Sequence, residues 1–174
     1  MSETYHLRRQ LVSIARGDRG RVEETKNRAP WIQKLWPATI YPEGYAARDP
    51  YCAAGMAWCL REWLKQPDVL DAFAMPPAAA EAWRCKSAAA FGWLDWAAHK
   101  GLSILPRDCI LHCADLVVYS YSHIEMVTDD DNTTTGPFVA IGYNTTASGS
   151  RDGEGCFEKP RERRLVKAFI RILS

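Results

Sequence analysis

The sequence has no run approaching about 18 consecutive apolar residues, the length that a membrane-spanning helix requires. Charge of one sign is not in excess either, because 22 Lys and Arg residues balance 21 Asp and Glu residues. A general nucleic-acid-binding protein needs a basic excess to displace counterions from phosphates. Residues 1–10 carry charges and a histidine where a secretory signal peptide would be apolar. We therefore expect no membrane insertion, no nucleic-acid partner and no cleaved leader.

The length of 174 residues suits one ordinary domain, and 47% hydrophobic with 25% charged residues is typical of a globular protein. Six cysteines are present, and without a leader we expect reduced thiols rather than disulfides. For Cys52 and Cys59, the geometry of a helix is a further reason to expect no disulfide between them. On one helix they would lie about 10 Å apart, beyond the limit of about 7 Å for a disulfide.

Hydrophobic spacing predicts helices in the first part of the chain and strands in the second. A helical pattern covers 5–16 and begins again at Tyr51, and Ser87 is a suitable N-cap for a helix through His99. Strand-forming residues are concentrated in 115–128, 138–143 and 165–173.

This order of elements predicts an α+β fold in which N-terminal helices pack on a small antiparallel β-sheet. We expect a single domain over 1–174, with a helical part at about 1–105 and a sheet part at about 106–174.

Cys52 is the most suggestive residue for chemistry, because it follows a proline-containing loop and opens an expected helix. The positive end of the helix dipole favours a thiolate there, and a thiolate is a nucleophile. A small core cysteine that happens to begin a helix is the alternative interpretation.

A thiolate nucleophile needs an imidazole beside it, and His123 lies in an expected strand that would hold its ring rigidly. Glu125, two residues further along, projects to the same face of that strand. If Thr128 pairs with Val139 across the polar loop 129–136, then His123 lies opposite Asn144 and could be oriented by its amide. A shift of one residue in the register of this strand pairing would place Tyr143 opposite His123 instead.

Several segments together resemble the CHAP-type cysteine amidases and endopeptidases of the NlpC/P60, papain-like group. The first has an aromatic residue, Cys52, two small residues and an aliphatic and aromatic helix. This first segment is 50–60. Segment 114–119 resembles the family's Gly-Asp-hydrophobic strand, and 122–124 resembles its Ser-His-Ile strand start. Segment 142–145 resembles its Gly-Asn-Thr turn, and 153–157 resembles the beginning of its closing strands.

The resemblance implies a papain-like fold with Cys52 as nucleophile, His123 as base and then acid, and Asn144 as the residue that orients the imidazole. Tyr51 or Tyr45 would assist the Cys52 backbone N–H in holding the oxyanion, and no cofactor or metal would be needed. Two departures from the family concern the third member of the site. Glu125 stands where the family has a small residue, so it is a second candidate to orient His123 or shift its pKa. Tyr143 also separates Gly142 from Asn144.

The implied reaction is hydrolysis of an amide bond in bacterial peptidoglycan through an acyl-enzyme, as an amidase or a stem-peptide endopeptidase. Without a leader, such a protein would reach the wall through lysis, a phage holin or a specialised secretion machine. An injected effector would also need an immunity partner, and we expect a monomer. Five tryptophans are candidates for the cleft walls: Trp31, Trp36, Trp58, Trp93 and Trp96.

Two other functions compete with hydrolysis. One is a module of the same fold that binds cell-wall peptide without cutting it. The other is a structural zinc site at Cys109, His112 and Cys113, which form a Cys-x-x-His-Cys cluster of soft ligands. The fourth zinc ligand would have to come from Cys85, Cys156 or His99, none of which has a paired spacing.

Overall fold

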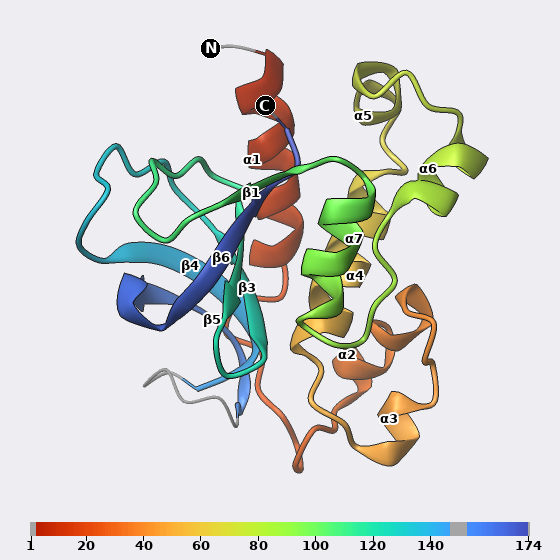
Figure 1. Ribbon diagram of the computed structural model, residues 1–174. Helices are drawn as coiled ribbons and strands as arrows, with labels where there is room; N and C mark the ends of the chain where they lie inside the picture. Colours follow the sequence, from red (N-terminus) through yellow and green to blue (C-terminus); the bar gives the residue numbers. More distant parts are fainter. Residues whose placement is uncertain (1–2, 147–152, 174) are drawn as a thin grey trace.

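The computed structural model describes residues 3–146 and 153–173, and Figure 1 shows helices on one side of a sheet. Seven α-helices and a short 3-10 helix precede the first strand of this described part, and a second 3-10 helix comes before the last strand. The helices are α1 (Glu3–Arg16), α2 (Pro30–Gln33), η1 (Trp36–Ala38), α3 (Gly44–Ala47), α4 (Cys52–Trp63), α5 (Pro67–Ala72), α6 (Pro77–Trp83), α7 (Gly92–His99) and η2 (Arg163–Leu165).

The six strands form one antiparallel sheet in the spatial order β1-β6-β2-β3-β4-β5. Strands β2 and β3 are buried along their whole length, as expected for the centre of a sheet that is covered on both faces. The strands are β1 (Ser103–Leu105), β2 (Leu116–Tyr119), β3 (His123–Val127), β4 (Phe138–Thr145), β5 (Gly155–Arg161) and β6 (Val166–Arg171).

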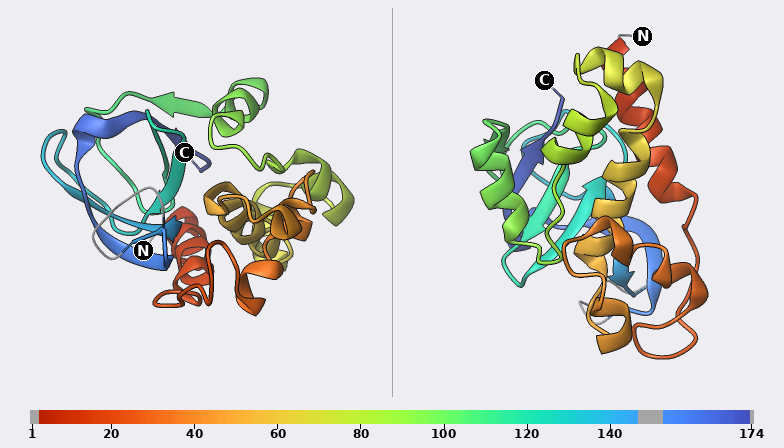
Figure 2. Two further views of the ribbon diagram at one scale, coloured as in Figure 1. Left: turned by 90° about the horizontal axis from the view of Figure 1, so that it is seen from below. Right: turned by 90° about the vertical axis from the view of Figure 1, so that its right-hand side faces the viewer.

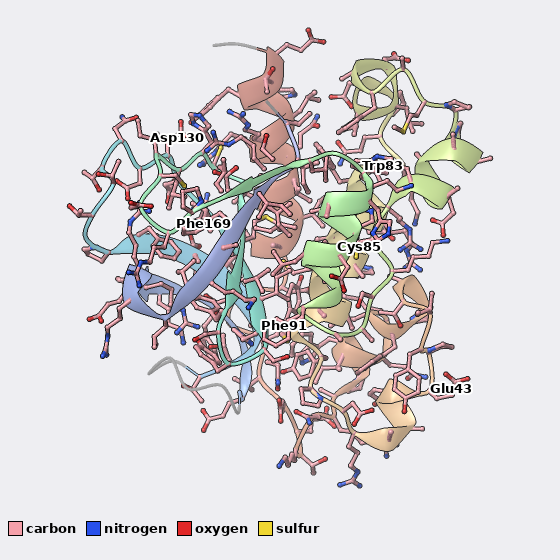
Figure 3. All side chains as sticks on the ribbon, viewed as in Figure 1. Glu43, Trp83, Cys85, Phe91, Asp130 and Phe169 are labelled. Atoms are coloured by element: carbon pink, nitrogen blue, oxygen red, sulfur yellow. The ribbon has the colours of Figure 1, made fainter. Side chains whose placement is uncertain are left out.

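The larger hydrophobic core lies between the helices and one face of the sheet, where α1 and α4 pack against β3 and β4. A smaller core, which includes Phe138 and Phe169, fills the other face. The sheet curves around this core (Figure 2), and Figure 3 labels Phe169. Side chains along β3 alternate between the two faces of the sheet, so Ile124 and Met126 belong to the larger core and Val127 to the smaller core. Glu125 lies between Ile124 and Met126 on β3, and His123, the first residue of the strand, lies next to Cys52 at the start of α4.

The α+β prediction is confirmed, and so is the strand pairing across the polar loop. Met126 pairs with Ile141 and Val127 with Ala140, and the Thr128 N–H donates to the Val139 carbonyl at 3.0 Å. All six cysteines are free, with Cys52 and Cys59 both on α4. Within 3–146 and 153–173, no helix is both long and apolar enough to cross a membrane.

Two expected elements differ from those observed. The segment 115–128 is two strands rather than one, because the chain turns between Tyr119 and His123, with Ser122 in the left-handed region at φ 61°. The helix expected from Ser87 begins only at Gly92. The Ser87 hydroxyl instead makes a local turn, in which it accepts from the Ala89 N–H at 3.1 Å and donates to the Ala89 carbonyl at 2.9 Å.

Gly55 sets how closely α4 approaches the sheet, because a methyl group at this position would overlap the ring of Tyr143 on β4. We predict that Gly55→Ala lowers the free energy of unfolding by about 1–3 kcal/mol through overpacking. Helix propensity alone would give a gain of about 1 kcal/mol, so the sign of the change separates the two effects. The measurement is the urea midpoint at constant m-value, and a higher midpoint for the variant would contradict the packing argument.

Candidate active site

Cys52 is the first residue of α4, at the point where the loop containing Pro50 enters the helix. The backbone N–H groups of a first helical turn have no partner within the helix, and they point toward this end. The thiol is 6% exposed, and the backbone N–H groups of Ala53 and Ile124 hydrogen-bond to its sulfur. The fold thus surrounds the sulfur with donors that favour its anionic form.

The imidazole of His123 lies beside this sulfur at the start of β3, and the two side chains are hydrogen-bonded. Its Nε2 atom is 3.1 Å from Oε1 of Glu125. Because one ring nitrogen pairs with the carboxylate, the other is left for the thiol. Tyr121 stacks on the His123 ring with 6.0 Å between ring centroids, which restricts the rotation of the ring.

Glu125 has no exposed surface, and two side chains besides His123 hold its carboxylate. The guanidinium of Arg161 on β5 donates from Nε to Oε2 at 2.7 Å, and its Nη2 also donates to Oε1. The Tyr119 hydroxyl donates to Oε2 at 2.9 Å. Room for this carboxylate exists because Gly142 on the adjacent strand has no Cβ, which would overlap it. Glu125 is therefore fixed independently of His123.

These contacts shift the pKa values of all three groups. Burial by itself would raise the pKa of Cys52, but the charge of His123 and the hydrogen bonds to the sulfur reverse this and lower it. Burial would lower the pKa of His123, whereas Cys52 and Glu125 raise it to about 9. Burial would raise the pKa of Glu125, whereas the hydrogen bonds and charges of His123 and Arg161 lower it to about 2. The arrangement favours a thiolate–imidazolium pair at neutral pH.

Cys52 is the one cysteine of the six whose pKa is lowered. Burial raises the others because none of them has a cationic partner strong enough to compensate. The pKa is raised to about 12 at Cys59 and Cys85, to about 11 at Cys113, and also upward at Cys109 and Cys156.

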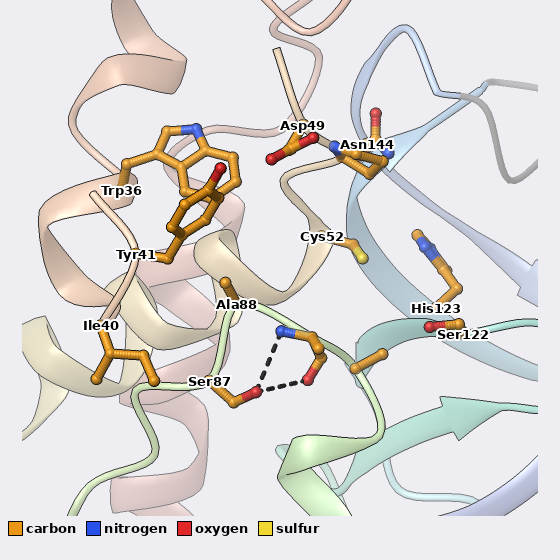
Figure 4. A pocket seen from close by; sticks show the side chains of 13 residues that line it. Trp36, Ile40, Tyr41, Asp49, Cys52, Ser87, Ala88, Ser122, His123 and Asn144 are labelled. Carbon is orange, nitrogen blue, oxygen red and sulfur yellow. Dashed lines mark hydrogen bonds between the residues drawn. The ribbon is translucent and has the colours of Figure 1, made fainter. Parts of the chain in front are cut away.

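A pocket of about 460 Å³ opens over the thiol and the imidazole (Figure 4). One wall comes from η1 and the segment after it, and another from the turn that Ser87 stabilises. The lining residues are Trp36, Ile40, Tyr41, Asp49, Pro50, Cys52, Ser87, Ala88, Ala89, Ala90, Ser122, His123 and Asn144. Its surface is mostly apolar, with Cys52 and His123 accessible to a molecule that enters it. Of the five tryptophans considered for the walls, only Trp36 lines it.

The prediction that Asn144 orients His123 is not supported by the structure. Asn144 lines the same pocket, but the ring nitrogen that it would bind is paired with Glu125. Among the residues that the structure describes, Oδ1 of Asn144 has no hydrogen-bond partner. The regular pairing of β4 with β5 is interrupted between Gly142 and Thr145, and Asn144 has a left-handed backbone at φ 53°. This irregularity breaks the alternation that placed Asn144 opposite His123.

The two tyrosines proposed to contact the oxyanion or substrate are also placed elsewhere. Tyr51 is fully buried, and its hydroxyl donates to Glu23 at 3.0 Å. The Tyr45 hydroxyl points to the Ala29 carbonyl at 3.4 Å. Neither tyrosine lines the pocket over Cys52.

The expected alternative of a zinc site gains no support from the described residues. Across 3–146 and 153–173, no three or more His, Cys, Asp or Glu side chains are grouped so as to hold a metal ion. Cys113 is buried, whereas His112 lies partly exposed with its Nδ1 3.8 Å from Asp130.

Sequence reasoning missed Arg161 and the pocket wall formed by 87–90. A basic residue in a strand gives no local sign that it is buried, and Arg161 lies 36 residues from the carboxylate that it binds. A sequence signal did exist for Gly142, since a glycine inside a strand often marks a close approach of another group.

Comparison of the chain with protein-family models, curated proteins and solved structures finds no significant match.

We predict that Cys52 reacts with iodoacetamide faster than the other five cysteines by at least tenfold at pH 6.5. An ordinary thiol is only about 1% thiolate at this pH, whereas the His123 pair keeps Cys52 ionised. Peptide mass spectrometry after timed quenching measures each rate. In His123→Asn the Cys52 rate should fall and its pH dependence should move toward that of a free thiol. Equal labelling of all six cysteines in the folded wild type would contradict the assignment.

We predict that Glu125→Gln destabilises the fold by about 3–5 kcal/mol, since it removes the carboxylate that compensates the buried Arg161 charge. Stabilisation by Glu125 is present above its unfolded pKa of about 4.3. It is lost as the pH falls toward its folded pKa of about 2. The difference between wild type and variant should therefore shrink below pH 4 in urea unfolding.

Glu62→Gln on α4 is the matched control for this measurement. Its carboxylate pairs with Lys65 at 2.7 Å but is partly exposed, so its removal should cost less than about 1 kcal/mol. Equal losses of unfolding free energy in Glu125→Gln and Glu62→Gln would contradict the prediction that the buried carboxylate contributes more to stability than the partly exposed one.

Proposed function

We propose that this protein is a cysteine hydrolase that cleaves an amide bond in bacterial peptidoglycan through an acyl-enzyme on Cys52. The observation that supports this best is the pairing of a helix-start thiol of lowered pKa with a buried imidazole on the floor of a substrate-sized pocket. Glu125 takes the orienting role for which Asn144 had been considered. The fold that accompanies this pairing is proposed to be papain-like.

In the first half-reaction, the Cys52 thiolate attacks the amide carbonyl carbon and a C–S bond forms. The negative charge that develops on the oxygen is stabilised by the Cys52 backbone N–H at the positive end of α4. His123, protonated and held by Glu125, gives its proton to the amide nitrogen. The C–N bond then breaks, the amine leaves, and a thioester with Cys52 remains.

In the second half-reaction, neutral His123 removes a proton from a water molecule, whose oxygen attacks the thioester carbonyl. The C–S bond breaks, the carboxylic acid product leaves, and the thiolate–imidazolium pair is restored. Atoms balance as one amide and one water giving one amine and one acid, so the reaction needs no oxidant or reductant.

Peptidoglycan is proposed as the substrate because of the resemblance of the sequence segments around Cys52 and His123 to CHAP and NlpC/P60 enzymes. The site of action is then the cell wall, in the periplasm or outside the cell, and an immunity or inhibitor protein is the expected partner for an injected form. An apolar wall with few polar groups suits the aliphatic and amide surface of a stem peptide.

We predict that the purified protein releases soluble muropeptides from peptidoglycan and that Cys52→Ala reduces the rate by at least about 10³-fold. The variant removes the nucleophile while α4 is retained. Liquid chromatography with mass spectrometry detects the products, and their new termini tell an amidase from an endopeptidase. His123→Asn should show a similar loss.

Cys59→Ala is the control, because this second buried cysteine of α4 does not line the pocket. It should keep the cleavage activity, even where its stability falls. Wild-type protein that releases nothing from peptidoglycans of several chemotypes, while remaining folded, would refute hydrolysis and favour a binding module.

A further inference from the structure

A second pocket of about 170 Å³ adjoins the pocket over Cys52, because Pro50 and Asn144 line both. It lies on the side away from Ser87 and the apolar wall, and in Figure 4 Asn144 and Asp49 mark that side of the main pocket. The remaining lining residues of the second pocket are Lys26, Asn27, Arg48 and Gly153. The two spaces together can hold a molecule longer than the main pocket alone accommodates.

Asn144, at the junction, has a hydrogen-bonding group that the described residues leave unused. The residue is 3% exposed, and within 3–146 and 153–173 its Oδ1 has no hydrogen-bond partner. A buried amide oxygen without a donor is destabilising, and such groups in native proteins call for an explanation. The left-handed backbone at this residue is a further local strain of the kind found at ligand sites. A bound molecule that donates an N–H at the junction satisfies the oxygen.

The two pockets differ in the charge that lines them. Lys26 and Arg48 are exposed on the second pocket, and neither forms an ion pair within the described part of the chain. Their loops are joined, since the Asn27 side-chain amide donates to the Arg48 carbonyl at 2.6 Å. The one acidic residue of the main pocket is Asp49, which accepts a hydrogen bond from Tyr41.

These cations are a local feature rather than part of a general basic surface, since the whole chain carries a formal charge of only +1. A carboxylate is therefore attracted to the second pocket, which Lys26 and Arg48 line, whereas none of the described residues that line the main pocket is a Lys or Arg. This difference favours an acidic molecule that lies across Cys52 with its carboxylate in the second pocket.

We propose that the second pocket binds a carboxylate of the substrate, with Lys26 and Arg48 as its cationic contacts and Asn144 Oδ1 accepting an adjacent amide N–H. The ligand class is an acidic peptide, and its identification with a peptidoglycan stem peptide rests on the proposed function. Asn144 is then a substrate-binding residue of the site, while Glu125 orients His123.

The test measures binding to Cys52→Ala, which cannot turn over a substrate. Two synthetic stem peptides of the same sequence are titrated by calorimetry, one with free side carboxylates and one with these carboxylates amidated. The free acid should bind roughly tenfold more tightly, as expected for a charge-assisted contact to two cations. Adding Lys26→Ala and Arg48→Ala should make the two affinities equal, and the difference should shrink in high salt.

Lys100→Ala with Arg107→Ala is the matched control, because it removes the same two charge types from exposed positions that line neither pocket. It should leave the preference intact. Equal affinities of the two peptides for Cys52→Ala would overturn the inference, whether or not the wild type digests peptidoglycan. A clear preference without digestion by the wild type would uphold the second pocket and refute the hydrolase.

Asn144→Gly tests the role of the junction residue, since glycine accepts the left-handed backbone and removes only the side chain. We expect weaker binding of both peptides on the Cys52→Ala background. In the otherwise wild-type enzyme we expect a raised KM and an unchanged pH dependence. A shift of the basic limb of the pH profile would instead assign Asn144 to the imidazole and overturn its substrate-binding role.

Discussion

The carboxylate of Glu125 is withdrawn completely from water, and the candidate site is built around what that requires. Taking an ionised carboxylate into a protein costs several kcal/mol, which only close charge and hydrogen bonds offset. Arg161 and the Tyr119 hydroxyl supply these from β5 and β2, two strands on opposite sides of β3. Because they saturate much of the carboxylate, its remaining interaction is with the ring of His123.

The same constraint accounts for the difference between Cys52 and the other cysteines. Cys59, further along α4, is also buried. Its pKa nevertheless rises to about 12, because its polar neighbours, chiefly Tyr143, do not offset the effect of burial. At Cys52 the anchored imidazole, together with donors at the helix start, outweighs desolvation. The pKa of each of these thiols thus depends on which charge is held next to it, and burial alone would have raised that of Cys52.

The elements that create this arrangement were predicted to different extents. Helix α4 and its start at Cys52 followed from the proline-containing loop and the apolar periodicity. The pairing of β3 with β4 followed from the short polar loop between them, and it is correct at Met126 and Ile141. Extending that register to Asn144 failed, since the strand leaves its regular path there and the alternation of side chains no longer applies. Glu125, kept as a second candidate, is the residue that contacts His123.

Taken by itself, the sequence determined the order of helices before strands and the position of Cys52 at a helix start. It also placed an imidazole and a carboxylate on one face of one strand. Each of these depends on neighbours a few residues apart, where backbone geometry allows little choice. Only the tertiary structure decided that Arg161 meets Glu125, that Glu125 and not Asn144 pairs with the imidazole, and that 87–90 line the pocket. These contacts join residues far apart in the chain, and the energy of burying charge and apolar surface together selects them.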